Sequence, residues 1–335
     1  MLQARRLTDV GGPTRVQQLL YAAAQLRGET LELSTLEVST TGDTSPSVPL
    51  RSLGAGAFTE ALDAAVAEGS ADAAVHSLKD APAALRPGLV LAACLPRADP
   101  RDVLIANDGA RSLGELVPGS RVGTSSSRRA AQIRHAYPHL QVVQLRGNVD
   151  ARLEKLRARE ISATVLALAG LERLGVSHVA SAVLSTDEML PAACQGAVGV
   201  VCREDDPWVR GLLSSFSHGP TMLELAAERA CLAALLGSEE AARGGQAFPD
   251  IAWACNVRYS DAPAGASGPE AGGDSRGGGG YLDLDCFVSD LEGTQLLRYT
   301  EFQRQVSGVD DAEELGSLYG SILRMTAAGQ GWLPQ

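Results

Sequence analysis

The chain has 335 residues, a hydrophobic content of 45% and a formal net charge of −11. This length exceeds what one hydrophobic core usually organises, so two or three domains are expected. No apolar run reaches the roughly 20 residues of a membrane-spanning helix, and no basic stripe stands against the acidic background, so we expect neither a membrane nor a nucleic-acid partner. The charged N-terminus lacks a following apolar segment, which predicts a cytoplasmic protein without a secretory signal.

Helical and strand patterns alternate along the first two thirds of the chain. Apolar residues on one face predict a helix over residues 14–26, alternation predicts a strand over residues 31–38, and a second helix is expected over residues 58–68. A short apolar strand follows at residues 71–75. The same rhythm repeats over residues 101–190, which indicates a second α/β unit with its own sheet.

The last third has a different pattern. A helix is expected over residues 222–236, then an interrupted β-rich region, and a final helix near residues 310–328. This order predicts a small α+β domain. Between residues 261 and 280 Gly, Ala, Ser and Pro dominate, and four consecutive glycines end the segment. That composition is typical of a flexible insertion rather than of a phosphate-binding loop.

A lysine and a carboxylate, Lys79 and Asp80, follow the short strand at residues 71–75, and Pro82 prevents its simple continuation. Loops at the carboxyl ends of strands in open α/β sheets are where ligands bind. An isolated Lys-Asp pair would more often be a solvated turn. Two similar junctions further along the chain favour a site.

The second junction, at residues 121–129, combines a strand end, a glycine turn, several hydroxyl groups and a helix with Arg128 and Arg129 in its first turn. Helix-start N–H groups, hydroxyls and guanidinium groups together suit a carboxylate or a phosphate. Arginines at the positive end of a helix dipole are unfavourable without an anion. A third junction at residues 142–152 again ends an apolar run with arginine and glycine, and we expect all three to converge on one cleft.

The order and spacing of these motifs resemble the hydroxymethylbilane synthase family, also called porphobilinogen deaminases. The motifs that carry the resemblance are residues 76–82, 99–102, 123–129, 145–149 with Arg152, 167–175, 190–199 and 227–230. The resemblance implies an α/β fold with two doubly wound lobes around a hinged cleft, plus a small C-terminal α+β domain. It places the first lobe at residues 1–96 and 197–217, the second at residues 97–196 and the third domain at residues 218–335. A monomer is expected.

The resemblance implies that four porphobilinogen molecules are joined head to tail, with loss of ammonia, into linear hydroxymethylbilane. Asp80 is then the candidate catalytic residue, because a carboxylate beside pyrrole N–H groups can stabilise the positive charge of the azafulvene intermediate and handle protons. Guanidinium groups suit the acetate and propionate groups of the substrate. The residues expected to bind substrate are Lys79, Ser126, Arg128, Arg129, Arg146, Arg152 and Arg173. For Arg152 and Arg173 the residue pattern alone favours a solvated helix face.

The resemblance also implies a dipyrromethane cofactor that is built from two substrate units and attached to a cysteine through a thioether. The corresponding position here holds Gln246, and an alternative frame holds Glu239. Neither side chain can form a thioether. Cys231 and Cys255 are the nearest thiols in sequence, although the apolar patterns around both favour core positions. Thr41 also stands where the family usually has an arginine.

Three functions remain open from the sequence. The first is a working synthase, the second is a catalytically impaired paralogue that binds porphobilinogen or another polycarboxylate, and the third is a solute-binding module, since two lobes around a hinge also suit ligand capture. Asp80 favours the enzyme, because a binder of carboxylates gains nothing from a like charge beside its ligand. The missing cysteine favours the binding paralogue.

Overall fold

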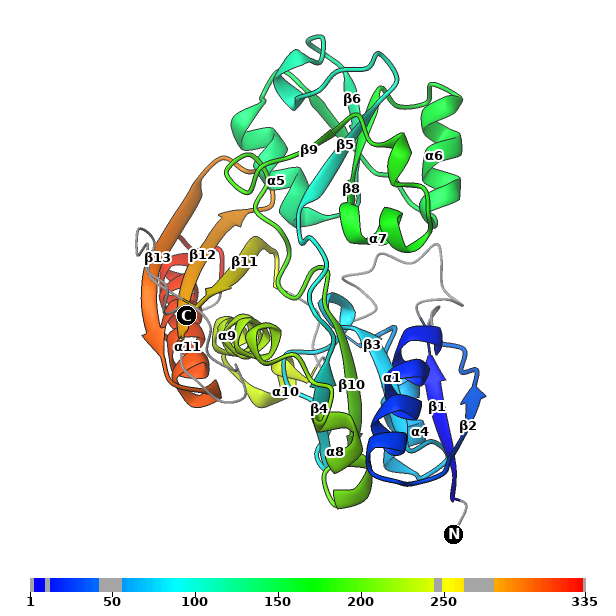
Figure 1. Ribbon diagram of the computed structural model, residues 1–335. Coiled ribbons are helices and arrows are strands. Elements are labelled where there is room, and N and C mark those ends of the chain that lie inside the picture. The colour runs from blue at the N-terminus through cyan, green and yellow to red at the C-terminus, as the bar shows by residue number, and fades with distance from the viewer. Residues whose placement is uncertain (1–2, 10–12, 42–55, 244–248, 262–279, 334–335) are drawn as a thin grey trace.

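The computed structural model describes residues 3–9, 13–41, 56–243, 249–261 and 280–333. Three β-sheets organise these residues into two α/β lobes and an α+β domain (Figure 1). Within the described ranges no helix is both long and apolar enough to cross a membrane.

The first sheet has the strand order β2-β1-β3-β10-β4. Its strands are β1 (Gln3–Asp9), β2 (Leu31–Leu36), β3 (Ala73–Ser77), β4 (Leu89–Cys94) and β10 (Val198–Arg203). Strands β1, β2 and β3 run parallel, whereas β10 arrives from the second lobe and pairs antiparallel with both β3 and β4. This pairing returns the chain to the first lobe, as the family resemblance implied.

Helices cover both faces of this sheet because successive strand residues point to opposite sides. On one face Val75 and Val200 pack with α1 (Pro13–Leu26) and α8 (Pro207–Ser214). On the other face Ala74 and Val201 pack with α4 (Glu60–Ala67). The helices predicted over residues 14–26 and 58–68 and the strand predicted from residue 31 are confirmed to within two residues at each end.

The second sheet has the order β7-β6-β8-β5-β9. Its elements are β5 (Asp102–Ala106), β6 (Arg121–Gly123), α5 (Ser127–Ala136), β7 (Gln141–Val143), α6 (Val149–Arg157), β8 (Ala163–Ala167), α7 (Leu168–Arg173) and β9 (Ala182–Val183). Short 3-10 turns lie at Leu78–Asp80, Leu113–Glu115 and Ser177–Val179. The predicted second α/β unit with its own sheet is therefore confirmed.

The third domain contains the antiparallel strands β11 (Ile251–Ser260), β12 (Gly280–Asp290) and β13 (Leu296–Val306), with α9 (Gly219–Leu236), α10 (Glu239–Ala242) and α11 (Val309–Gly329). Helices α9 and α11 pack closely on each other, and the long helices predicted at residues 222–236 and 310–328 are confirmed. The predicted flexible insertion falls largely on residues 262–279, which lie outside the described residues.

Two segments join the lobes: residues 95–101 form the first crossing and residues 190–197 form the second. They run side by side between the sheets (Figure 1). The N–H of Ala98 in the first crossing donates to the carbonyl oxygen of Gly196 in the second at 3.1 Å. Gly196 has a φ of +85°, and a Cβ atom there would lie 2.5 Å from the carbonyl oxygen of Ala98. Only glycine adopts a positive φ readily and also leaves room for the carbonyl oxygen of Ala98. Gly196 therefore allows the two crossings to approach each other closely.

Candidate functional site

Lys79 and Asp80 lie directly after strand β3, as the sequence predicts. The buried side chain of Leu78 anchors the turn, and its N–H donates to the carbonyl oxygen of Ala197 at 3.1 Å. Both Lys79 and Asp80 are exposed. The sheet core thus fixes the turn, while the two charged side chains point out of it.

A cavity of about 130 Å³ opens beside Lys79. Residues from both lobes, the second crossing and the third domain line it: Lys79, Ser126, Arg128, Cys194, Arg229 and Trp253. The first two predicted junctions therefore meet at one cavity. Cationic side chains on its wall favour an anionic ligand.

Asp102 is a buried carboxylate beneath this cavity, and the sequence analysis assigned it no role. It is 0% exposed and accepts hydrogen bonds from Arg128 Nη2 at 2.8 Å, from Arg129 Nη2 at 2.8 Å and from Gln195 Nε2 at 2.9 Å. Burial acts to raise the pKa of Asp102, but the charges and hydrogen bonds of the two arginines outweigh burial and lower it. Asp102 is therefore ionised at neutral pH.

The expectation that Arg128 and Arg129 reserve their guanidinium groups for a bound anion needs correction. The anion that the first turn of α5 requires is the side chain of Asp102. Arg128 also donates to the carbonyl oxygen of Leu190 at 2.6 Å, so both of its terminal nitrogens have a protein partner. Arg129 is 7% exposed, and its Nε has no partner in the described part of the chain. Arg129 thus keeps a donor for a ligand.

Ser126 has a structural contact as well as a place on the cavity wall. Its Oγ accepts the N–H of Arg129 at 3.4 Å and caps helix α5. Caps of this kind typically stabilise a helix by about 1 kcal/mol.

The third predicted junction brings further positive charge close to Arg129. Arg152 in α6 is half-buried, and its Nε donates to the carbonyl oxygen of Gly147 at 2.8 Å. Burial lowers the pKa of Arg152, and the charges of Arg129 and Arg146 lower it further. Repulsion among three guanidinium groups favours an anion between them. Arg173 is exposed at the end of α7, and it is not among the residues that line the cavity.

Lys79 belongs to the same electrostatic group. Asp80 acts to raise the pKa of Lys79, but desolvation in the cleft and the charges of Arg129 and Arg128 outweigh that effect, so the pKa is lowered. An ammonium group in such surroundings gains from a carboxylate that replaces lost solvent.

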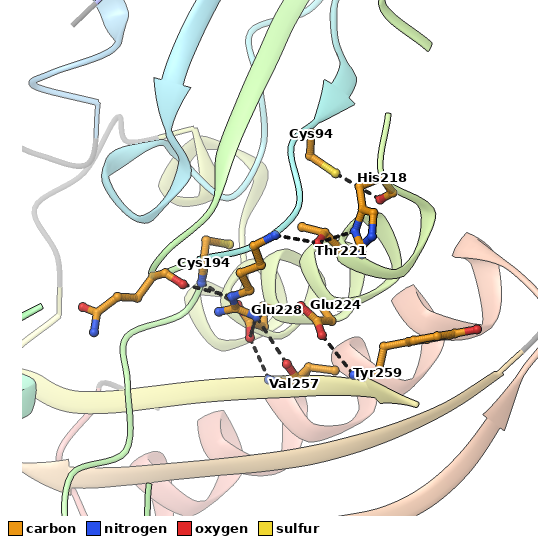
Figure 2. Close-up of polar contacts among 10 residues, drawn as sticks. Cys94, Cys194, His218, Thr221, Glu224, Glu228, Val257 and Tyr259 are labelled. Atoms are coloured by element: carbon orange, nitrogen blue, oxygen red, sulfur yellow. Dashed lines mark hydrogen bonds and ion pairs between the residues drawn. The ribbon is translucent and has the colours of Figure 1, made fainter. Parts of the chain in front are cut away.

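A second buried network ties the two crossings to the third domain (Figure 2). Glu228 in α9 is 0% exposed, and Arg97 binds both of its oxygens, at 2.9 and 3.0 Å. The same carboxylate accepts the backbone N–H groups of Cys194 and Val257 (Figure 2). Arg97 Nε also donates to the carbonyl oxygen of Gln195 at 2.9 Å. The pair therefore holds both crossings against β11.

The charge state of this network follows from its contacts. Burial acts to lower the pKa of Arg97, but the charge and hydrogen bonds of Glu228 outweigh burial and raise it. Arg97 could not be predicted as a structural residue from the sequence, because a single charged residue between two lobes has no local pattern that marks it.

Two α/β lobes joined by two crossings, with Lys79 and Arg128 on the wall of the cavity, define the architecture of a two-lobed protein suited to an anionic ligand. The family model for the porphobilinogen deaminase, dipyromethane cofactor binding domain, matches residues 14–211. A porphobilinogen deaminase of Sorangium cellulosum is 39% identical over 296 residues, which cover 88% of this chain and 89% of the relative. The chain belongs to the porphobilinogen deaminase family.

Other relatives match over shorter regions. A porphobilinogen deaminase of Sphingopyxis alaskensis is 48% identical over 66% of this chain and 72% of its own length. The chloroplastic porphobilinogen deaminase of rice is 48% identical over 60% of this chain, and the match spans 56% of the rice protein. Among solved structures, an ABC-transporter periplasmic substrate-binding protein from Coxiella burnetii aligns with 64% of this chain and 92% of its own, with a TM-score of 0.39 and 15% identity.

The residues of the cavity fit one part of the cofactor that the family implies and do not fit another. Lys79 on the cavity wall suits its carboxylates, as do Arg129 and Arg152 outside the lining residues. No cysteine suits a thioether, because all six are buried. Cys231 and Cys255, the two thiols considered from the sequence, are 0% exposed and contact each other inside the third domain. Gln246 and the side chain of Glu239 lie outside the described residues.

Proposed function

We propose that the chain is a hydroxymethylbilane synthase, which condenses four porphobilinogen molecules with loss of four ammonia molecules into a linear tetrapyrrole that water releases as hydroxymethylbilane. The observation that carries the proposal is the position of Asp80. It lies exposed in the turn beside Lys79, which lines the cavity together with Arg128 and interacts with the charges of Asp80 and Arg129. An exposed carboxylate beside a cationic cleft can act on a cationic reaction centre while the surrounding cations hold the substrate's carboxylates.

The proposed roles follow the charges that develop in one condensation. The C–N bond of the aminomethyl group breaks, the nitrogen takes a proton and leaves as ammonia, and the Asp80 carboxylate stabilises the positive azafulvene that remains. The free α-carbon of the next pyrrole forms the new C–C bond and then loses its proton. Lys79, Arg129, Arg146 and Arg152 hold acetate and propionate groups, and Arg173 extends this set along the second lobe.

The test is the release of ammonia and of linear tetrapyrrole by the purified chain. Asp80→Asn should lower kcat by about 10²- to 10⁴-fold, because the amide neither carries the charge nor accepts the proton. Porphobilinogen affinity should change little. Glu68→Gln, another exposed carboxylate of the first lobe, is the matched control and should leave kcat unchanged. Full activity of Asp80→Asn would remove the basis of the proposal.

We also propose a cellular location and an oligomeric state for the protein. We expect the chain to act in the cytoplasm. We also expect a monomer, since both lobes, the second crossing and the third domain of a single chain supply the wall of the cavity.

A further inference from the structure

The cysteines of this chain are all buried, whereas covalent attachment of a pyrrole requires an accessible thiol. All six cysteines are within the described residues, and none exceeds 4% exposure. Cys94 and Cys202 lie in strands of the first sheet, Cys194 lies in the second crossing, and Cys231, Cys255 and Cys286 lie in the core of the third domain. A two-ring adduct needs a thiol that opens on the cleft.

Cys194 is the cysteine that lines the cavity, yet its surroundings oppose reaction. It is 4% exposed, and its own N–H is bonded to the buried carboxylate of Glu228. Burial and the charge of Glu228 raise the pKa of the thiol to about 12. The thiolate is the nucleophile, and a thiol with this pKa provides only about one thiolate in 10⁵ at neutral pH.

The thiols of the third domain are less accessible still. Cys231 of α9 contacts Cys255 of β11, and Cys286 faces Cys255 across the β11–β12 pair. Helix α11 covers the other side, where Gly320 packs on the backbone of Cys231. An adduct on any of these sulfurs would require separation of α9, β11 and α11, which together form the main core of the domain.

In contrast to the buried thiols, several cationic side chains lie at or near the cleft. Arg129 Nε is buried without a partner, and the guanidinium group of Arg152 lies within electrostatic reach of both Arg129 and Arg146. Lys79 adds an ammonium group beside Asp80, and its pKa is lowered because desolvation and the charges of Arg129 and Arg128 together outweigh the nearby carboxylates. Two joined porphobilinogen units carry four carboxylates, which are opposite in charge to these cationic groups and suited to ion pairs with them.

We infer that this chain holds its two-pyrrole primer without a thioether bond, through ion pairs between the primer's carboxylates and Lys79, Arg129, Arg146 and Arg152. The inference rests on the proposed function. Retention by charge makes the primer removable: salt screens ion pairs, and unfolding disperses the four cations, whereas neither breaks a thioether.

The experiment compares two masses of the full-length chain after incubation with porphobilinogen. Under native conditions the mass should rise by two substrate units less one ammonia, because one C–C bond has formed and one amine has left. Under denaturing conditions the mass should return to that of the bare chain. Dialysis against about 1 M salt should empty the native complex as well. Arg152→Gln should reduce the retained fraction at least tenfold.

A positive control comes from the family position. Gln246→Cys should give a denaturation-resistant increase of two substrate units less two ammonias, because the new C–S bond releases the second amine. The same increase on the unaltered chain would overturn the inference, and peptide mapping would then identify the modified thiol, with the proposed function intact. Ammonia release without any pyrrole in the native complex would also overturn it. A chain that neither releases ammonia nor binds a pyrrole would refute the proposed function itself.

Discussion

Asp102 is the residue whose carboxylate pairs with two buried guanidinium groups. Asp102→Asn should lower the free energy of unfolding by about 3–5 kcal/mol, because it leaves Arg128 and Arg129 buried without a counter-charge. Urea denaturation of the full chain measures this loss. Asp99→Asn is the matched control: its partner Arg101 is largely exposed, and an exposed pair contributes at most about 1 kcal/mol. Equal losses in the two variants would contradict the assignment.

The same carboxylate predicts how stability depends on pH. The pKa of Asp102 is lower in the folded chain than in the unfolded one, so the unfolded chain binds the proton more readily. The stabilisation is therefore complete above the unfolded pKa of about 4 and is lost as the pH falls through the lower, folded pKa. Urea midpoints measured from about pH 6 down to about pH 3 should fall less steeply for Asp102→Asn than for the unaltered chain. Parallel slopes would show that Asp102 is not the group responsible.

Local sequence predicts the positions of single residues better than their partners. A β-compatible run, a lysine, a carboxylate and a proline are enough to place Lys79 and Asp80 at a strand end. The pairing of Arg128 and Arg129 with Asp102 depends instead on α5 beginning beside β5, two elements separated by more than twenty residues. The dipole of α5 favours an anion at the start of that helix. The local sequence does not show whether this anion is a bound ligand or a side chain from another strand.

Among the elements, α9 and α11 show why a helix can prefer glycine. Gly316 and Gly320 of α11 pack against the backbone of Ala227 and Cys231 in α9. Gly320→Ala should lower the free energy of unfolding by about 1–3 kcal/mol, because the added methyl group overlaps the carbonyl oxygen of Cys231. Gly329→Ala, with open space at the end of the same helix, should be neutral or stabilise by up to about 1 kcal/mol. Thermal unfolding of both variants distinguishes packing from helix propensity.

The spacing of apolar residues predicted the helices that bury one face, but it did not predict strand β1. The helices at Pro13–Leu26 and Val309–Gly329 follow the predicted ranges closely because their apolar residues recur at the helical spacing. Strand β1 pairs with β2 and β3 inside the sheet, although its residues 3–9 are mostly polar. Strands inside parallel sheets usually read as apolar runs, so this segment lacked the signal on which the prediction relied.

At the scale of the whole molecule, the network around Glu228 determines how the third domain is joined to the lobes. The carboxylate contacts the first crossing through Arg97, the second through Cys194 and strand β11 through Val257 (Figure 2). Removal of its charge leaves the buried Arg97 with only the longer contact to Glu224 as an ion pair, and loss of a partner from a buried ion pair typically costs about 3–5 kcal/mol. Because one side chain links three segments, the effect should reach all of them.

Glu228→Gln should therefore accelerate amide hydrogen exchange at residues 95–101, at residues 190–197 and in β11 together, with a lower urea midpoint for the whole chain. Glu224→Gln is the matched control, since Glu224 contacts the same arginine at 3.3 Å from a more exposed position. Its exchange should change mainly near Tyr259, whose N–H it accepts at 3.0 Å (Figure 2). Faster exchange confined to α9 in Glu228→Gln would mean that each crossing is held by its own lobe. The relative position of lobes and third domain would then depend on the apolar contacts across the junction, where Leu78, Ala81 and Ala197 pack with α9.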